Sequence, residues 1–119
     1  FYMCQELMPG MVAAGWGRVV NMCSLAAKTG GITAGTAYST SKGAMQTLTV
    51  SLALEVAKKG VTVNAINPAY VKTPMVTEQL TEAQREETLA KIPVGRFCEP
   101  EEVAHAVKFL IPPPSGFIT

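Results

Sequence analysis

The sequence has no excess of charge of either sign, since its 10 basic and 9 acidic residues leave a net charge of +1. Nucleic-acid-binding domains carry a pronounced basic surface, so this balance gives no reason to expect a nucleic-acid partner. No apolar run approaches the ~20 residues that a membrane-spanning helix needs. Residues 1–10 also lack the basic segment and apolar core of a secretory signal. We therefore expect a cytoplasmic protein with neither a membrane nor a nucleic-acid partner.

Cysteine and histidine are scarce, which limits the chemistry available. Cys4, Cys23 and Cys98 are odd in number and far apart, a pattern that excludes a disulfide framework and zinc knuckles. The single histidine, His105, has no cysteine, histidine or carboxylate at metal-ligand spacing, so no metal site is expected. No G-x-S-x-G elbow is present. A hydrolase that uses Ser24 and His105 remains as an alternative.

The 119 residues suffice for at most one domain. Apolar spacing and turn-forming residues predict a helix, a strand, a second helix, a second strand and two further helices. The expected segments are a helix at 1–15, a strand at 17–23, a glycine-rich loop at 26–35, a helix at 36–59, a strand at 61–66, helices at 81–92 and 99–111, and an extended end at 115–119. This order is typical of an α/β fold with a parallel sheet.

Polar residues follow both predicted strands and open the helix between them. Ser24 follows the first strand, Tyr38 and Lys42 lie in the first turns of helix 36–59, and residues 67–73 follow the second strand. In a right-handed crossover the helix runs antiparallel to its two strands, so it starts beside their carboxyl ends. We therefore expect these groups to converge at the edge where open α/β sheets bind ligands.

Helix 36–59 carries apolar residues on two faces. Positions 38, 42, 45, 49, 52 and 56 share one face, which is mostly apolar after the first two positions and should pack on the sheet. The second face is also apolar, at positions 44, 48, 54 and 57. We expect a partner subunit to cover this face. A tyrosine four residues before a lysine also arises by chance, and the spacing alone leaves that alternative open.

The Tyr38-x-x-x-Lys42 pair is one of four motifs that follow one another along the chain. The pair is preceded by "NMCS", whose Ser24 stands fourteen positions before the tyrosine, and is followed by "VNAINPAYVKTPM" and "PVGRFCEPEEVA". Together these motifs resemble the short-chain dehydrogenase/reductase family over essentially all 119 residues. The details are most similar to 3-oxoacyl-acyl-carrier-protein reductases and acetoacetyl-CoA reductases. The resemblance implies a Rossmann-type, doubly wound parallel sheet.

The resemblance implies catalytic roles for three residues. Tyr38 is then the general acid that protonates the carbonyl oxygen as hydride arrives from a nicotinamide cofactor, or the base in the reverse direction. Lys42 binds the nicotinamide ribose and places a cation near the tyrosine hydroxyl, which favours the ionised form of that group. Ser24 orients the carbonyl through its hydroxyl. Without the resemblance, Ser24 would be interpreted as a cap at the strand end.

The resemblance also implies a cofactor site for NADP or NAD, with NADP favoured. Tyr38 and Lys42 contact this cofactor, Val71 and Thr73 match positions that hold the nicotinamide carboxamide, and Pro68 shapes the turn. Without the resemblance, Thr73 would be interpreted as a helix N-cap. The groups that choose between NADP and NAD follow strands of the family that are missing here.

Two family motifs are absent: the glycine-rich turn after the first strand and an N-N-A-G segment. We therefore interpret residues 1–119 as the C-terminal portion of one Rossmann-type domain whose N-terminal, cofactor-binding half is missing. We expect the parent protein to be an NAD(P)-dependent carbonyl reductase and these 119 residues alone to be inactive. The alternative is a catalytically inactive dimerisation or interaction module.

The resemblance suggests a substrate and partners for the parent protein. The substrate is expected to be a small-molecule carbonyl compound, or the matching alcohol in reverse, and a 3-oxoacyl thioester of acyl-carrier protein or coenzyme A fits best. Such a reaction belongs to fatty acid biosynthesis. Residues 26–35 and 74–95 should line the substrate pocket. Helix 36–59 is expected to join subunits into a homodimer or homotetramer.

Overall fold

The computed structural model describes residues 1–31 and 34–119 of the chain. Its elements in order are α1 (Tyr2–Ala13), β1 (Gly17–Met22), α2 (Ala26–Thr29), α3 (Thr36–Val56), β2 (Val61–Ile66), α4 (Pro74–Gln79), α5 (Glu82–Ala90) and α6 (Pro100–Leu110), with 3-10 turns at Ala57–Lys59 and Pro113–Ser115. The predicted order of helices and strands is confirmed.

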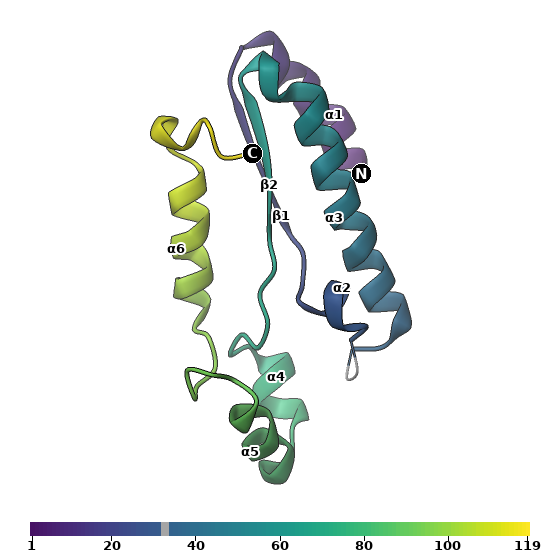
Figure 1. Ribbon diagram of the computed structural model, residues 1–119, viewed down its shortest axis with the longest axis vertical. Helices are drawn as coiled ribbons and strands as arrows, with labels where there is room; N and C mark the ends of the chain where they lie inside the picture. The colour runs from purple at the N-terminus through teal and green to yellow at the C-terminus, as the bar shows by residue number, and fades with distance from the viewer. Residues whose placement is uncertain (32–33) are drawn as a thin grey trace.

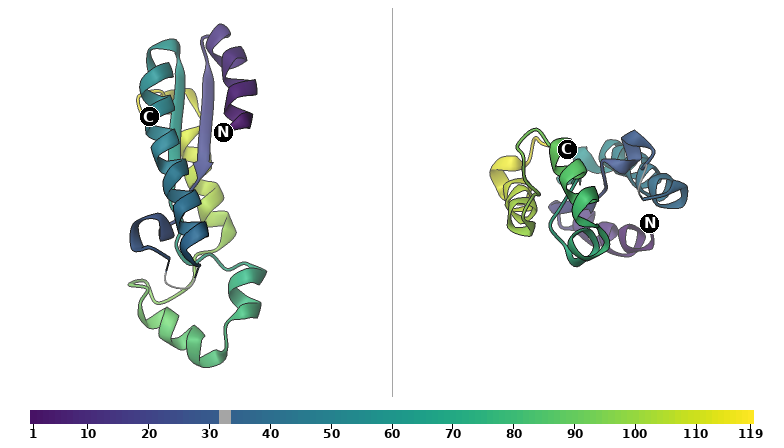
Figure 2. Two further views of the ribbon diagram at one scale, coloured as in Figure 1. Left: turned by 90° about the vertical axis from the view of Figure 1, so that its right-hand side faces the viewer. Right: turned by 90° about the horizontal axis from the view of Figure 1, so that it is seen from below.

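The two strands form a parallel sheet in register from Gly17 opposite Val61 to Met22 opposite Ile66. Helix α3 is the crossover between them, and it lies with α1 on one face of the sheet while α6 covers the other face (Figures 1 and 2). The chain is therefore a helix–sheet–helix sandwich with a parallel sheet, as the alternation of elements predicts.

The end of helix α3 follows from a glycine. After the 3-10 turn Ala57–Lys59, Gly60 adopts a left-handed conformation with φ of 80° and ends the helical segment. Gly60 also lies against the Gly15 backbone, because a Cβ at position 60 would come within 2.1 Å of the Gly15 carbonyl oxygen. The predicted helix end at Gly60 is confirmed, and β2 begins at the next residue as predicted.

Short helices are the main difference from the sequence-based expectations. The predicted loop 26–35 contains the single helical turn α2, which begins where the Ala26 N–H donates to Ser24 Oγ at 3.1 Å and ends at left-handed Gly30. Residues 32 and 33 of that loop lie outside the described part. No range was predicted for helix α4, although the alternative interpretation of Thr73 as an N-cap implies a helix there and Pro74 is placed at its start. Helices of 4 and 6 residues are too short to show an apolar period.

The end of the chain differs from the predicted extended segment 115–119. A 3-10 turn occupies Pro113–Ser115, and only the last residues run beside β2. There the Val63 N–H donates to Thr119 Oγ1 at 2.9 Å, and the Asn64 amide donates to the Ile118 carbonyl at 2.8 Å. The turn follows from the prolines, which cannot donate backbone hydrogen bonds to a sheet.

The core lies between the sheet and helices α1 and α3. Its buried members are Met8, Val56, Val61 and Val63, of which Val61 and Val63 are fully buried. The inner face of α3 matches the predicted stripe, since positions 49 and 56 are buried and positions 42, 45 and 52 are half-buried. The opposite face of α3 is open, and Leu54 there is 82% exposed. Within the described residues, no helix is long and apolar enough to cross a membrane.

Candidate active site

The carboxyl ends of both strands, the start of α3, and helices α2, α4 and α5 gather at one end of the molecule (Figure 1). The cause is topological, because α3 runs antiparallel to the strands that it connects. All of the residues singled out by sequence motifs lie in or beside these segments. The predicted convergence at this edge of the sheet is confirmed at the level of elements.

Lys42 links the start of α3 to the end of β1. Its Nζ donates a hydrogen bond of 2.6 Å to the carbonyl oxygen of Met22, the last residue of the strand. The same Nζ lies 5.6 Å from the centre of the Tyr38 ring, one helical turn earlier. An ammonium has three donors, so the bond to Met22 leaves two for a ligand. Tyr38 is 41% exposed and therefore accessible to one.

Ser24 follows β1 and begins the turn into α2. Its Oγ accepts the hydrogen bond from the Ala26 N–H at 3.1 Å, which is the capping role that the residue type alone suggests. A hydroxyl that accepts one bond keeps its own O–H as a donor. Ser24 is therefore both a local cap and a candidate donor to a carbonyl oxygen.

The segment after β2 is tied to the other parts of the site. The Leu25 N–H donates to the Pro68 carbonyl at 3.0 Å, which holds the segment beside the Ser24 turn. The Gln46 amide bonds to Asn67 Oδ1, which joins the segment to α3. These contacts come from two different elements. They bring the predicted residues 67–73 to the same edge as Ser24 and Lys42.

Val71 forms a short parallel bridge with Cys98. The Cys98 N–H donates to the Tyr70 carbonyl at 2.9 Å, and the Lys72 N–H donates to the Cys98 carbonyl at 2.8 Å. In this pattern the N–H and C=O of Val71 itself point away from Cys98. The Val71 N–H therefore faces away from Cys98 and is a candidate donor to a planar amide ligand such as a nicotinamide carboxamide.

Thr73 stands at the N-cap of α4, the role that its residue type suggests without the family resemblance. Its N–H donates to the Val71 carbonyl at 2.8 Å, which closes a tight turn after the bridge. The turn places residues 71 and 73 together at the start of a helix. The residues present therefore fit a nicotinamide cofactor: two free Lys42 donors for hydroxyl groups and a backbone donor for an amide.

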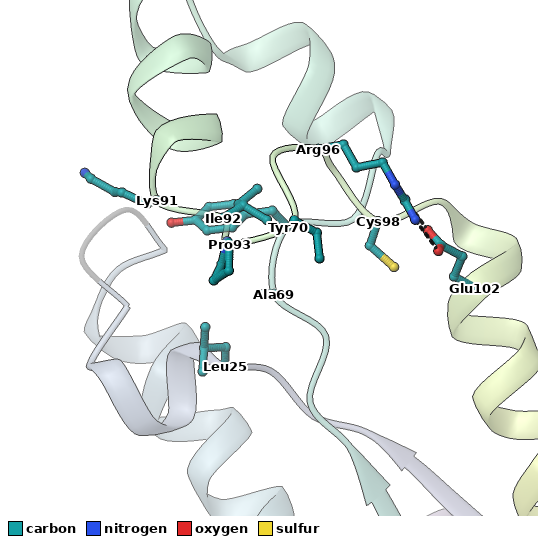
Figure 3. Close-up of a pocket in the computed structure, with 10 residues that line it drawn as sticks. Leu25, Ala69, Tyr70, Lys91, Ile92, Pro93, Arg96, Cys98 and Glu102 are labelled. Carbon is teal, nitrogen blue, oxygen red and sulfur yellow. Dashed lines mark hydrogen bonds and ion pairs between the residues drawn. The ribbon is translucent and has the colours of Figure 1, made fainter.

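An open pocket lies beside these residues. It is lined by Leu25, Ala69, Tyr70, Lys91, Ile92, Pro93, Val94, Arg96, Cys98 and Glu102. Figure 3 shows Leu25 facing Ile92 and Pro93, with Tyr70 next to them. This wall of the pocket is apolar, and it joins Ser24 through its sequence neighbour Leu25. Of the segments expected to line a substrate pocket, 74–95 contributes Lys91 to Val94 to this pocket, whereas 26–35 contributes none of the lining residues among those described.

Cys23 and Glu102 are among the groups near the site whose pKa values are shifted. Burial raises the pKa of the Cys23 thiol, while the Lys42 ammonium acts in the opposite direction, so Cys23 is a buried thiol and not an activated nucleophile. Hydrogen bonds from Arg96, and then from the Glu99 backbone, lower the pKa of Glu102 to about 2. The carboxylate of Glu102 is therefore ionised at any physiological pH.

Other candidate chemistry receives no support from the described residues. They contain no group of three histidine, cysteine or acidic residues that could hold a metal ion. Ser24 Oγ contacts the Ala26 N–H, and His105 is exposed on α6 without a hydrogen bond to Ser24. Sequence reasoning missed Leu25 and did not single out Tyr70 or Ile92 within the segments that it placed at the site, because these residues belong to no catalytic motif.

Comparison with known proteins agrees with this geometry. A family model described as enoyl-(acyl carrier protein) reductase matches residues 1–119. The acetoacetyl-CoA reductase of Rhizobium meliloti (strain 1021) is 44% identical over 119 residues, which are 100% of this chain and 49% of that protein. The chain thus spans about half the length of the relatives that it matches.

Solved structures share the fold of this chain. The 3-oxoacyl-[acyl-carrier protein] reductase from Brucella melitensis superposes with a TM-score of 0.92 at 33% identity, over 98% of this chain and 43% of that one. A structure from Beutenbergia cavernae with bound NADP superposes with a TM-score of 0.85 at 31% identity, over 98% of this chain and 47% of that one. The match of the whole chain to the family model, together with these relatives, shows that this chain belongs to the short-chain dehydrogenase/reductase family of NAD(P)-dependent oxidoreductases.

Proposed function

We propose that the protein containing this chain reduces a carbonyl group to a hydroxyl with NADPH or NADH, and that Tyr38, Lys42 and Ser24 are its catalytic residues. The observation that carries the proposal is the position of Lys42, whose Nζ bonds to the end of β1 and lies 5.6 Å from the Tyr38 ring centre. Residues 1–119 form the C-terminal portion of the Rossmann-type domain.

The cofactor supplies hydride to the carbonyl carbon. Tyr38 donates its hydroxyl proton to the carbonyl oxygen, so the products are the alcohol and the oxidised cofactor. The Lys42 cation stabilises the tyrosinate that remains, and its two unused donors bind the nicotinamide ribose. Ser24 donates its O–H to the same carbonyl oxygen while its Oγ accepts from the Ala26 N–H.

Residues after β2 hold the nicotinamide ring in this proposal. Val71 and Thr73 would contact the carboxamide, and the Val71 N–H, which is not bonded to Cys98 in their bridge, would be a donor to it. Pro68 fixes the turn between β2 and this segment, and its carbonyl accepts from the Leu25 N–H. The bound NADP of the structure from Beutenbergia cavernae supports NADP as the cofactor. NAD remains the alternative.

We infer that the substrate is a 3-oxoacyl thioester of acyl-carrier protein or coenzyme A. The names of two similar proteins, an acetoacetyl-CoA reductase and a 3-oxoacyl-[acyl-carrier protein] reductase, support this substrate class. The apolar wall of Leu25, Ile92 and Pro93 suits the hydrocarbon part of such a substrate. In this role the protein acts in the cytoplasm in fatty acid biosynthesis.

The proposal also includes association of subunits. The outer face of α3 exposes Val50 (62%) and Leu54 (82%), and α1 beside it exposes Tyr2 and Met3. Apolar side chains gathered on neighbouring helices are typical of a protein interface. We infer a homodimer or homotetramer that buries α3. An inactive interaction module would use the same surface without turnover.

Replacement of Tyr38 by phenylalanine tests the catalytic proposal. Tyr38→Phe removes only the hydroxyl, so in the protein as its gene encodes it we expect about 10³-fold lower turnover of acetoacetyl-CoA with NADPH or NADH. The matched control is Tyr2→Phe, which removes a hydroxyl from an 80% exposed ring on α1 and should leave the rate unchanged. If the unmutated protein binds partners but reduces no 3-oxoacyl thioester, the interaction module is correct instead.

A further inference from the structure

A second set of contacts lies behind the proposed carboxamide site. It joins residues 96–99, which precede α6, to residues 70–72, which follow β2. Strand β2 ends at Ile66, so residues 70–72 have no neighbouring sheet strand to fix their backbone. Apart from the Thr73 N–H, which donates to the Val71 carbonyl, the only segment that bonds to their backbone among the described residues is the one around Cys98.

The segment around Cys98 is anchored to α6 by a bidentate ion pair. Arg96 Nη1 lies 2.6 Å from Glu102 Oε2, and Arg96 Nη2 lies 2.7 Å from Glu102 Oε1 (Figure 3). The same Oε2 accepts the Glu99 N–H at 2.9 Å. A planar, two-point pair fixes direction as well as distance. The backbone of residues 96–99 is therefore held against the first turn of α6.

The segment around Cys98 is then joined to residues 70–72 by a second ion pair and by ring packing. Lys72 Nζ lies 2.9 Å from Glu99 Oε1. The buried ring of Phe97 packs edge-on against Tyr70, with ring centres 6.5 Å apart. Together with the two backbone bonds of Cys98, every residue from 96 to 99 contacts either α6 or residues 70–72.

We propose that Arg96, Glu99 and Glu102 are positioning residues, which hold the backbone of residues 70–73 in the conformation that receives the nicotinamide carboxamide. We call these three residues the loop clamp. The inference rests on the proposed function, since it needs a bound nicotinamide. Helix α6 packs on both strands, so the loop clamp transfers the rigidity of the sheet to a segment beyond its end.

The loop clamp makes a prediction that a simple helix cap does not. If the loop clamp acts only on the nicotinamide half of the cofactor, breaking it weakens the binding of NADPH and NADH. It does not weaken the binding of 2′-phospho-ADP-ribose and ADP-ribose, the matching fragments that lack the nicotinamide ring. The apparent affinity falls in proportion to the fraction of molecules with a competent loop. A cap that merely stabilises α6 would change the affinity for cofactor and fragment equally or not at all.

The test measures dissociation constants by titration calorimetry on the protein as its gene encodes it. Arg96→Glu replaces the attraction to Glu102 by repulsion, and we expect NADPH or NADH to bind about tenfold more weakly. Glu102→Gln keeps an oxygen that accepts the Glu99 N–H but loses the ion pair, and we expect this variant to bind NADPH or NADH about threefold more weakly. The fragments should bind within twofold of their unmutated affinity in both variants.

Glu101→Gln is the matched control. It removes the same charge from the same first turn of α6, where Glu101 contacts neither Arg96 nor residues 70–72. Its affinity for NADPH and NADH should be unchanged. Arg96→Lys, which keeps the charge but not the two-point geometry, should lie between the unmutated protein and Arg96→Glu.

Each remaining outcome decides against part of the proposal. Equal losses for cofactor and fragment, or no loss in Arg96→Glu, overturn the loop clamp and leave the proposed function standing. An unmutated protein that binds neither NADPH nor NADH overturns the proposed function and the loop clamp with it. A lower melting temperature without a change in the cofactor-to-fragment ratio shows a purely structural ion pair.

Discussion

Lys42 makes its two contacts from one atom, and this explains why a lysine is placed there. Nζ reaches the Met22 carbonyl at 2.6 Å and stays 5.6 Å from the Tyr38 ring centre. The carbonyl bond fixes an otherwise flexible four-carbon side chain, so the cation stays beside the ring without further help. Met22, which no motif marks, is thus part of the site through its backbone.

Replacement of Lys42 by methionine should separate this role from a structural one. Lys42→Met keeps the length of the side chain but loses the cation, so we expect kcat/KM to fall by about 10²-fold or more and the affinity for the cofactor to weaken. The measurement is steady-state kinetics beside a melting curve. Lys58→Met, near the other end of the same helical segment, is the control. Loss of stability with unchanged kcat/KM would show that Lys42 has only a structural role.

Gly60 decides how α3 is connected to β2. Its φ of 80° disfavours any L side chain, and a Cβ there would lie 2.1 Å from the Gly15 carbonyl oxygen. We expect Gly60→Ala to lower the free energy of unfolding by at least about 1–2 kcal/mol, the cost of the left-handed conformation alone. Unfolding in urea measures this change in free energy.

Gly10→Ala is the control for the Gly60 substitution. A Cβ at Gly10 meets nothing within 4 Å inside helix α1. Alanine there should raise the free energy of unfolding by about 0.5–1 kcal/mol, because it restricts the unfolded chain. If both variants were destabilised equally, the backbone conformation of Gly60 would not be the cause.

The start of α6 should give stability a dependence on acid pH. The pKa of Glu102 is lowered from 4.5 to about 2 by Arg96 and by the Glu99 N–H. A carboxyl whose pKa is lower in the folded state stabilises the fold above its unfolded pKa. That contribution is lost as pH falls from about 4.5 to about 2. In Glu102→Gln we expect a flatter dependence of unfolding free energy on pH in this window, measured by urea titration, whereas Glu101→Gln should keep the original slope.

As a whole, the chain is extended and has little core. Its radius of gyration is 16.4 Å, against about 13.5 Å for a compact domain of this length. The buried apolar residues of the described part are Met8, Cys23, Val56, Val61, Val63 and Phe97. Two parallel strands with so small a core are marginal by themselves. The expected inactivity of these 119 residues alone stays a prediction, and the small core supports it.

A charged residue on the outer face of α3 tests whether subunits meet there. Leu54 is 82% exposed, so a lysine or glutamate would cost nothing in a lone subunit but would place an unpaired charge in an interface. We expect Leu54→Glu to shift the mass measured by light scattering from the dimer or tetramer to smaller species. Ala104→Glu, at an exposed position of α6 away from α3, measures the effect of an added charge alone. An unchanged mass in Leu54→Glu would place the interface elsewhere.

The sequence by itself determined the order of elements, the crossover and the convergence of Ser24, Tyr38 and Lys42 at one sheet edge. These depend on local patterns and on the fixed hand of a βαβ connection. It did not reveal α2 and gave no range for α4, because helices of 4 and 6 residues are too short to show an apolar period.

Only the tertiary structure decided which atoms meet across the site. The sequence did not reveal that the Met22 carbonyl is the partner of Lys42, that an apolar pocket wall lies beside Leu25, or that Arg96 pairs with Glu102 behind Val71. The pocket and the Lys42 bond join segments far apart along the chain, and Arg96 reaches Val71 only through Cys98 and Glu99. Such contacts are set by how the helices pack on the sheet. No local pattern of residue types encodes which segments come together in that packing.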